Sequence, residues 1–259
     1  MKSLRYFLTA VVAVLALVSC QKEDNPYTPG EPANSNGYNV YFSAENPSSF
    51  VIGLSDNQFT IIVDRENGGS ALSVPIECSS ESDIFNFPAS IDFAAGEITK
   101  EITISFSGAD PFVSYSFELK IPEEYTNPYK LVEGYPAFSA SMLQEDYKVV
   151  ATGTWYDDFW TGETWAQELE YSELQDMYRF SNVWDEGYGF TFKWDKSTNK
   201  FSSLPGKMET GIVSSSYGMI SATAVSFEYD AEGNEIDMLF KWTVSAGSFG
   251  NYYNIFYFD

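Results

Sequence analysis

The 259-residue sequence contains no histidine and only two cysteines, Cys20 and Cys78. Without an imidazole, no Ser-His-Asp or Cys-His catalytic group can be built. Zinc sites made of thiolate and imidazole ligands are excluded as well, and two cysteines offer no disulfide framework once Cys20 is modified as argued below. We therefore predict no metal site, no cofactor and no catalytic residues. Cys78, in the sequence LSVPIECSS, is expected in or at the end of a strand.

Basic residues are also scarce. The chain has 14 Lys and Arg against 37 Asp and Glu, which gives a formal net charge of -23 at pH 7. Such a surface repels phosphate backbones and anionic head groups, so nucleic acid is excluded as a partner. The apolar content of 44% and the aromatic content of 17% are too high for a disordered chain. Neutral, polyhydroxylated or cationic partners remain.

Long apolar runs are missing except at the N-terminus. Lys2 and Arg5 precede an uncharged run from Phe7 to Val18, which is the plan of a signal peptide. The run is too short for a transmembrane helix, which needs about 20 residues. Leu17-Val18-Ser19-Cys20 resembles the bacterial lipobox. The resemblance implies cleavage before Cys20 and a lipid anchor of several acyl chains, palmitate among them, on this residue. A plain signal peptide cut near an incidental cysteine is the alternative.

The residues after Cys20 indicate the destination of the protein. In bacterial lipoproteins, an aspartate at the next position is the usual signal for retention at the inner membrane, and this chain has Gln21 there. Gln21, Lys22, Glu23 and Asp24 together resemble an export tag of lysine plus acidic residues. The resemblance implies an outer-membrane protein exposed at the cell surface. A polar start of a linker is the alternative interpretation.

The composition divides the chain into four parts. Residues 1–19 form the signal peptide, and the proline-rich polar residues 20–37 form a lipidated N-terminus and flexible linker. The next part, residues 38–143, has short segments rich in β-branched and aromatic residues. Within it, Ile98 to Phe106 alternates a mostly apolar face with a polar face, as in a β-sandwich. The sequence Asn67-Gly68 after Phe59 to Val63 predicts a hairpin turn.

A known family is similar to this first domain. The runs FTIIVDRENGGSALSVPI and ASIDFAAGEITKEITISF, from Phe59 to Phe106, resemble the Calx-beta domain, with the turn Phe93 to Glu97 as the most characteristic element. The resemblance covers residues 38–121 and implies an immunoglobulin-like sandwich. Calcium-binding members gather carboxylates from two regions, since Ca²⁺ takes several oxygens. Here Gly53-Leu54-Ser55 and the lone Asp110 occupy those regions, so we expect no calcium site.

The fourth part, residues 144–259, contains all six tryptophans. Apolar and polar residues alternate over 165–172 and 188–194, and the turn 230–235 lies between two alternating runs, which predicts a hairpin. We expect an antiparallel meander of roughly seven to nine strands, forming a barrel or sandwich. This part resembles the C-terminal β domains of surface lipoproteins from glycan-utilisation systems. The predicted fold class is therefore all-β, with an immunoglobulin-like sandwich followed by an antiparallel β-barrel or sandwich.

Two tryptophans suggest a ligand site. Sugars stack their C–H faces on aromatic rings while carboxylates and amides bind their hydroxyls. Trp165, Trp194 and Trp242 alternate in phase with apolar residues and are expected in the core. Trp160 and Trp184 instead lie next to turn residues, where they either face solvent or cover the ends of the barrel. The candidate glycan-binding residues are Trp160, Trp184, Asp157, Asp158, Asp185 and Glu186.

Carboxylates allow one enzymatic alternative. Paired acids hydrolyse glycosides, and Asp157, Asp158, Glu163, Asp185 and Glu186 are candidates for such a pair. A chain with 37 acidic residues produces such pairs by chance. We therefore predict a non-enzymatic surface lipoprotein that binds a glycan or assists an outer-membrane complex for glycan uptake. The alternative is a structural or adhesive surface protein whose partner is another protein.

Overall fold

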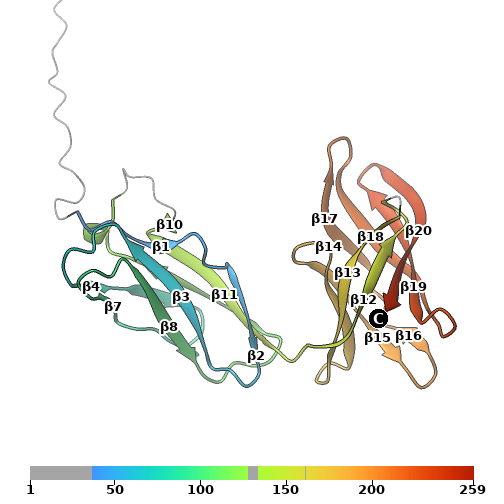
Figure 1. The fold of residues 1–259 in the computed structure, drawn as a ribbon, viewed down its shortest axis with the longest axis horizontal. Coiled ribbons are helices and arrows are strands. Elements are labelled where there is room, and N and C mark those ends of the chain that lie inside the picture. The colour runs from blue at the N-terminus through green and yellow to red at the C-terminus, as the bar shows by residue number, and fades with distance from the viewer. Residues whose placement is uncertain (1–36, 128–133, 161) are drawn as a thin grey trace, which may run out of the picture.

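The computed structural model describes residues 37–127, 134–160 and 162–259. These residues form strands and loops, with one short 3-10 helix at Glu123–Tyr125. Figure 1 shows two bodies that lie end to end, joined by a short connection between β11 and β12. The fold class predicted from the sequence is confirmed: a β-sandwich is followed by a curled antiparallel sheet. Within the described ranges, no helix has the length and apolar character that a membrane crossing requires.

The first domain packs two sheets face to face. Their strand orders are β10-β1-β3-β8-β6 and β2-β11-β9-β5, and β4 pairs with β7 beside them. The first sheet contains β10 (Gly134–Tyr135), β1 (Val40–Ser43), β3 (Gln58–Arg65), β8 (Thr99–Phe106) and β6 (Phe85–Asn86). The second contains β2 (Ser49–Gly53), β11 (Ala137–Glu145), β9 (Ser114–Lys120) and β5 (Glu77–Ser80). The small pair is β4 (Leu72–Pro75) and β7 (Ser90–Phe93).

Alternating residues of these strands form the core of the sandwich. In β8, Ile102, Ile104 and Phe106 are buried between the sheets, as the alternation predicted. Ile98 precedes the strand and is 55% exposed, so it does not belong to this face. Cys78 lies within β5, as predicted, with its side chain exposed.

The hairpin predicted at Asn67-Gly68 is wrong. Strand β3 pairs with β1 and β8, whereas β4, which follows the turn, pairs with β7. Arg65 explains this path. Its side chain is buried and donates hydrogen bonds to the carbonyl oxygens of Ser70, Ala94 and Glu97 at 2.7 to 2.8 Å. These bonds satisfy a buried guanidinium and tie the loop after β3 to the turn that precedes β8.

The second domain is one nine-stranded antiparallel sheet in the order β16-β15-β14-β13-β12-β20-β19-β18-β17. Consecutive strands are neighbours except β16 and β17, which lie at the two edges of the sheet, and β20 returns to pair with β12. The strands are β12 (Lys148–Asp157), β13 (Glu163–Ser172), β14 (Met177–Asp185), β15 (Tyr188–Asp195), β16 (Lys200–Ser202), β17 (Lys207–Ser214), β18 (Gly218–Asp230), β19 (Glu235–Val244) and β20 (Gly247–Phe258).

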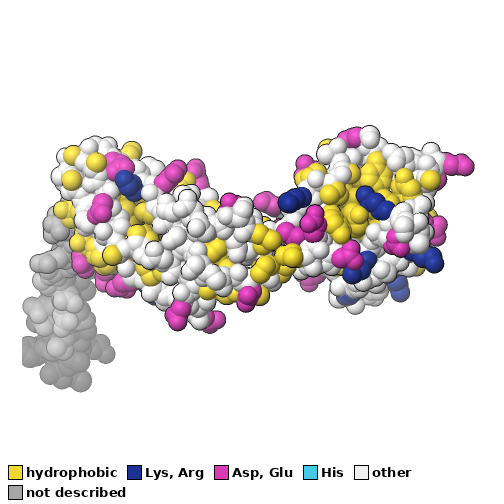
Figure 2. All heavy atoms as spheres, turned by 90° about the horizontal axis from the view of Figure 1, so that it is seen from below, with side chains coloured by type: hydrophobic (Ala, Val, Ile, Leu, Met, Phe, Trp, Pro, Cys, Tyr) yellow, Lys and Arg dark blue, Asp and Glu magenta, His cyan; other side chains and the backbone are white. Residues whose placement is uncertain are grey.

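The sheet curls around a core of aromatic rings. The curl brings β17, at one edge, next to β14 and β15 near the other edge. The predicted hairpin is confirmed, since Asp230 of β18 pairs with Glu235 of β19. In β19 the alternating residues are all fully buried: Ile236, Met238, Phe240 and Trp242. The outer surface carries acidic side chains on both domains, as Figure 2 shows for one face.

Candidate functional site

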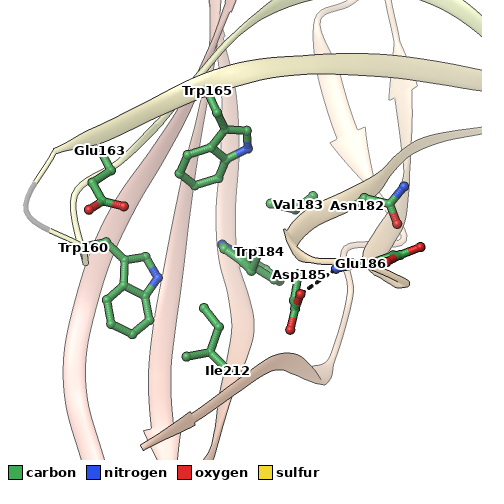
Figure 3. A pocket seen from close by; sticks show the side chains of 9 residues that line it. All are labelled: Trp160, Glu163, Trp165, Asn182, Val183, Trp184, Asp185, Glu186 and Ile212. Atoms are coloured by element: carbon green, nitrogen blue, oxygen red, sulfur yellow. Dashed lines mark hydrogen bonds between the residues drawn. The ribbon is translucent and has the colours of Figure 1, made fainter.

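A groove of about 790 Å³ opens at one end of the second domain. Strand β12 starts at Lys148, next to the junction with the first domain, and ends at Asp157, beside the groove. The groove therefore lies at the end of the strand remote from the junction. We call it the tryptophan groove, and Figure 3 shows its lining residues: Trp160, Glu163, Trp165, Asn182, Val183, Trp184, Asp185, Glu186 and Ile212.

Two irregular strands border the groove. In β14, residues 181–184 lie opposite a single residue of β15, Gly189. A Cβ atom at Gly189 would be 2.0 Å from the carbonyl oxygen of Ser181, so only glycine fits there. In β17, residues 210–212 lie opposite Ile220 alone, and Gly211 has φ +80°. Such bulges bend strands and redirect side chains. Here they point Trp184 and Ile212 into the groove.

Three half-buried indole rings form the walls. Trp165 stacks on the buried Trp155 with ring centroids 6.3 Å apart. Trp184 packs edge-on against Trp242 at 5.4 Å. Trp160 contacts the same ring of Trp242 at 6.4 Å. Each wall therefore rests on a fully buried tryptophan, which fixes the ring while leaving part of it open to solvent.

Polar groups stand at both ends of the row of rings. Glu163 lies beside Trp160 and Trp165, and Asp185, Glu186 and Asn182 lie beyond Trp184 (Figure 3). The Asn182 Oδ1 atom accepts the backbone N–H of Gly187 at 2.7 Å. This bond orients the amide so that its N–H groups remain as donors. The groove thus offers flat apolar faces, carboxylate acceptors and one amide donor.

Asp157 lies beneath the groove and is fully buried. Its Oδ1 atom accepts the backbone N–H groups of Phe159 at 2.9 Å and Trp160 at 3.3 Å, which fixes the turn that carries Trp160. Burial raises the pKa of Asp157 to about 6, and the N–H groups of Trp160 and Phe159 offset only part of that effect. Asn254 and Trp184 lie near enough to stabilise the carboxylate, but no described residue makes a hydrogen bond of normal geometry to Oδ2.

The predicted site residues thus fall into three places. Trp160, Trp184, Asp185 and Glu186 line the tryptophan groove together. Asp157 is buried and holds the Trp160 turn from below, so it does not face a ligand. Asp158, the next residue, lies on the outer face of the sheet, where it lines a different hollow with Tyr156, Glu228, Asp237 and others. Adjacent residues of an extended strand end point to opposite faces, which separates the two aspartates.

Sequence reasoning missed several groove residues. Trp165, Trp194 and Trp242 were all expected in the core. Of these three, only Trp242 is fully buried. Trp165 is half-buried in the groove wall, and Trp194 is half-buried elsewhere. Asn182 and Ile212 carried no local signal. A glycine inside a strand pattern is a sign of a bulge, so Gly189 and Gly211 were the available hints.

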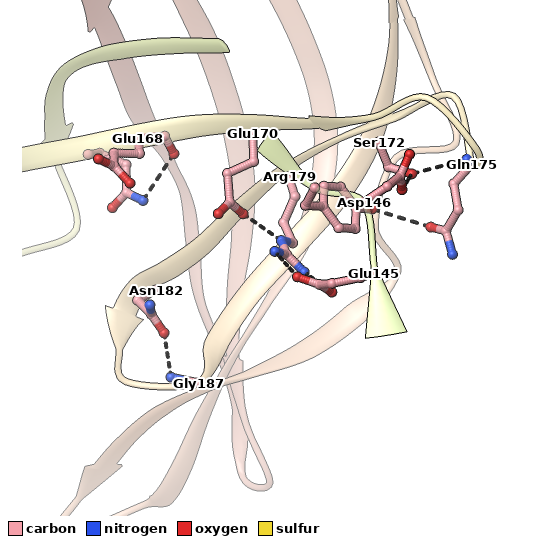
Figure 4. Close-up of polar contacts among 11 residues, drawn as sticks. Glu145, Asp146, Glu168, Glu170, Ser172, Gln175, Arg179, Asn182 and Gly187 are labelled. Carbon is pink, nitrogen blue, oxygen red and sulfur yellow. Dashed lines mark hydrogen bonds and ion pairs between the residues drawn. The ribbon is translucent and has the colours of Figure 1, made fainter. Parts of the chain in front are cut away.

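A second polar cluster lies at the junction of the domains (Figure 4). Arg179 of β14 donates two hydrogen bonds to Glu145 at 2.6 and 2.8 Å and one to Glu170 at 2.6 Å. Its guanidinium also lies 3.8 Å from the ring centre of Tyr147. Asp146 accepts the backbone N–H of Leu174 at 3.0 Å. The end of β11 and the connection are therefore bound to the second domain, and we read this cluster as structural.

No protein-family model and no curated protein matches the chain. Among solved structures, the calcium binding domain CBD12 of CALX1.1 is 12% identical with a TM-score of 0.31, covering 55% of this chain and 78% of that chain. CBD12 from CALX1.2 is 12% identical with a TM-score of 0.32, covering 82% and 83%. A Bacteroides ovatus protein of unknown function is 10% identical with a TM-score of 0.31, covering 85% and 93%. TM-scores this low carry no argument about function.

The lipidation and export residues, Cys20 and Gln21 to Asp24, lie outside the described residues. The domain limits predicted at 38–143 and 144–259 stay a prediction. In the structure, the chain leaves the sandwich at Glu145 and enters the second sheet at Lys148.

The first prediction concerns the charge of Asp157. A carboxyl with a raised folded-state pKa binds a proton between about pH 4 and pH 6 that the unfolded chain has already released, so its ionisation lowers stability as the pH rises. Asp157→Asn keeps an oxygen acceptor for the turn and carries no charge. Relative to wild type, its free energy of unfolding should rise by about 2 to 3 kcal/mol from pH 4 to pH 7, because one pKa unit corresponds to about 1.4 kcal/mol.

Urea denaturation at both pH values checks this, with Asp195→Asn as the control, because it removes a carboxyl whose pKa is lowered and not raised. Hydrogen bonds from Ser197 and Thr198 lower the pKa of the exposed Asp195 to about 2. Asp195 therefore ionises mainly below pH 4, and the difference in stability between that variant and wild type should change little from pH 4 to pH 7. A stability difference for Asp157→Asn that does not change with pH would show that Asp157 titrates normally.

The second prediction concerns the junction. Arg179→Ala leaves the mostly buried carboxylates of Glu145 and Glu170 unpaired, which should cost about 2 to 4 kcal/mol in free energy of unfolding. Lys193→Ala breaks the exposed pair with Asp176 and should cost less than about 1 kcal/mol. Equal effects of the two substitutions in urea denaturation would contradict a structural role for the Arg179 cluster.

Proposed function

We propose that this protein is a non-enzymatic, lipid-anchored protein of the outer-membrane surface that binds a glycan in the tryptophan groove and serves a glycan-uptake complex. The observation that carries the proposal is the groove itself, in which Trp160, Trp165 and Trp184 stand beside carboxylate and amide groups. Aromatic faces stack on the C–H faces of sugars, and the polar groups bind hydroxyls and set orientation. A groove open to solvent suits a chain that extends beyond its binding site.

The rings are fixed before any ligand arrives. Trp184 packs on Phe190 at 5.8 Å and on Phe240 at 5.5 Å, in addition to Trp242. Trp160 is held through its backbone by Asp157. Side chains already held in one position lose little further conformational freedom on binding, which favours affinity. Stacking worth about 1 kcal/mol per ring beyond area burial suits a weak, reversible capture site.

The placement of the carboxylates favours binding over hydrolysis. A glycosidase needs one carboxyl that stays protonated near neutral pH, and burial is the usual means of keeping it so. Glu163, Asp185 and Glu186 in the groove are all exposed. The buried carboxyl, Asp157, does not line the groove. The acid and the partner that hydrolysis requires are therefore not together in this groove.

The order of the parts fits display at a cell surface. A lipid on Cys20 would hold the N-terminus at the membrane, and the predicted linker would separate the sandwich from it. The sandwich follows, and Figure 1 shows the second domain at its opposite end from the start of the described chain. The tryptophan groove lies at the end of β12 away from the junction, where it is open to large ligands.

The third prediction tests the groove with a glycan panel against the protein without its signal segment. Trp160→Ala should weaken binding of any glycan that the panel identifies by about tenfold, as the loss of roughly 1.4 kcal/mol requires. Trp194→Ala is the matched control, since this ring stacks on Phe201 at 5.5 Å away from the groove and binding should persist. Thermal melting verifies that both variants fold.

Unchanged affinity of folded Trp160→Ala for such a glycan would place the site elsewhere. If no glycan binds and the protein instead captures a specific outer-membrane protein, the adhesive or structural alternative is correct.

The fourth prediction tests the anchor. Cys20→Ala should abolish lipid incorporation and move the protein out of the membrane fraction, whereas Cys78→Ala, within β5 of the sandwich, should leave both unchanged. Protease added to intact cells should remove the wild-type ectodomain. Normal membrane partitioning of Cys20→Ala would reject the lipid anchor, and full protection from protease would reject surface display.

A further inference from the structure

We propose that the tryptophan groove selects its glycan by charge, binding chains with protonated amino groups more tightly than neutral chains of the same linkage and rejecting chains with carboxylates or sulfates. This inference rests on the proposed function and names the class of ligand. Its basis is the unbalanced charge of the groove. Three of its nine lining residues are acidic and none is basic.

The acidic residues of the groove have no cationic partner. Glu163, Asp185 and Glu186 are exposed, and no lysine or arginine in the described part of the chain forms an ion pair with them. The contrast with the junction is clear, because Glu145 and Glu170 there share Arg179. The negative charge at the groove is therefore available to a ligand.

The carboxylates stand where an amino sugar would need them. Glu163 lies at the end of the groove beside Trp160 and Trp165, and the Asp185-Glu186 pair lies at the other end beside Trp184 (Figure 3). An ammonium group near these rings would meet both an aromatic face and a carboxylate. Asp185 uses Oδ1 to accept the N–H of Glu186 at 2.9 Å, which leaves Oδ2 for the ligand.

The same arrangement acts against acidic sugars. A uronate or sulfate stacked on these rings would place its charge near one or more carboxylates and would find only the Asn182 amide and the indole N–H groups as side-chain donors in the groove. Like charges at such distances are unfavourable, and removing the ligand's charge from water adds to the cost. A neutral sugar meets neither penalty and lacks the attraction, so it should bind with intermediate affinity.

The expected selectivity is moderate and depends on salt. A single exposed charge pair changes affinity by a factor of roughly 1.5 to 5. Three carboxylates together should therefore favour an amino-bearing chain by about tenfold over its neutral counterpart at low ionic strength. Salt screens exposed charges, so the preference should shrink at high ionic strength while the stacking contribution remains.

The experiment compares three probes on the protein without its signal segment. They are a β-1,4-linked glucosamine hexamer, the same hexamer fully N-acetylated, and an oligogalacturonate of equal length, at a pH where the amines are protonated. We expect the glucosamine hexamer to bind about tenfold more tightly than the acetylated hexamer, and no measurable binding of the galacturonate. High salt should bring the first two affinities together.

Variants show whether the groove is responsible. The combined substitution Glu163→Gln, Asp185→Asn and Glu186→Gln should remove the preference for the amine and retain binding of the acetylated hexamer. Glu168→Gln, on the same strand as Glu163 and outside the groove, removes a negative charge and should leave the preference unchanged. Trp160→Ala should weaken both hexamers.

The outcomes separate this inference from the proposed function. If the acetylated hexamer binds as well as the amine, or if the galacturonate binds best, selection by charge is wrong and glycan binding stands. A preference that persists in the triple variant would reflect the overall charge of the protein, and it too overturns the inference. If none of these probes and no glycan of the wider panel binds, the proposed function itself fails.

Discussion

The tryptophan groove of the second domain depends on the packing around one fully buried side chain, the indole of Trp242. It stacks on Phe159 with ring centroids 4.2 Å apart and planes within 5°, and it contacts Trp184 and Trp160 at their edges. The rings of the β12–β13 turn and of β14 are thereby held in position by β19, which pairs with β18 on one side and with β20 on the other. A close-packed aromatic core resists rearrangement. The positions of the Trp160 and Trp184 rings therefore depend on this one strand.

The groove exists because strand pairing fails next to this core. If β14 paired regularly with β15, and β17 with β18, successive side chains of β14 and β17 would point alternately to the two faces of the sheet. The bulges at 181–184 and 210–212 interrupt the pairing of both strands where the curled sheet brings β14 and β17 together.

The buried carboxyl group of Asp157 lies in the same region. It is unfavourable for stability when ionised, yet its oxygen holds the turn that presents Trp160, so stability is lost where the groove gains a fixed ring.

Local sequence patterns were sufficient to predict the strands but not to predict which strands pair. The alternation over Ile236 to Trp242 gave a correct strand with a fully buried face, and the Asp230–Glu235 turn joined the strands on either side of it. The Asn67-Gly68 turn had an equally good local signal and was wrong, because Arg65 bonds to carbonyls 5, 29 and 32 residues away. A hairpin is decided by neighbours in sequence, whereas a crossover between sheets is decided by contacts that sequence spacing does not show.

The sequence by itself determined the all-β class, the acidic surface, the absence of imidazole chemistry and the suspicion that Trp160 and Trp184 lie together near turns. These follow from composition and from periodicities of a few residues, which are local properties. Only the tertiary structure decided that Trp165 joins them, that Asp157 lies below the groove while Asp158 faces the other side of the sheet, and that no basic residue lines the groove. Those facts depend on sheet curl and on two bulges, and both arise from pairing between strands far apart in the chain.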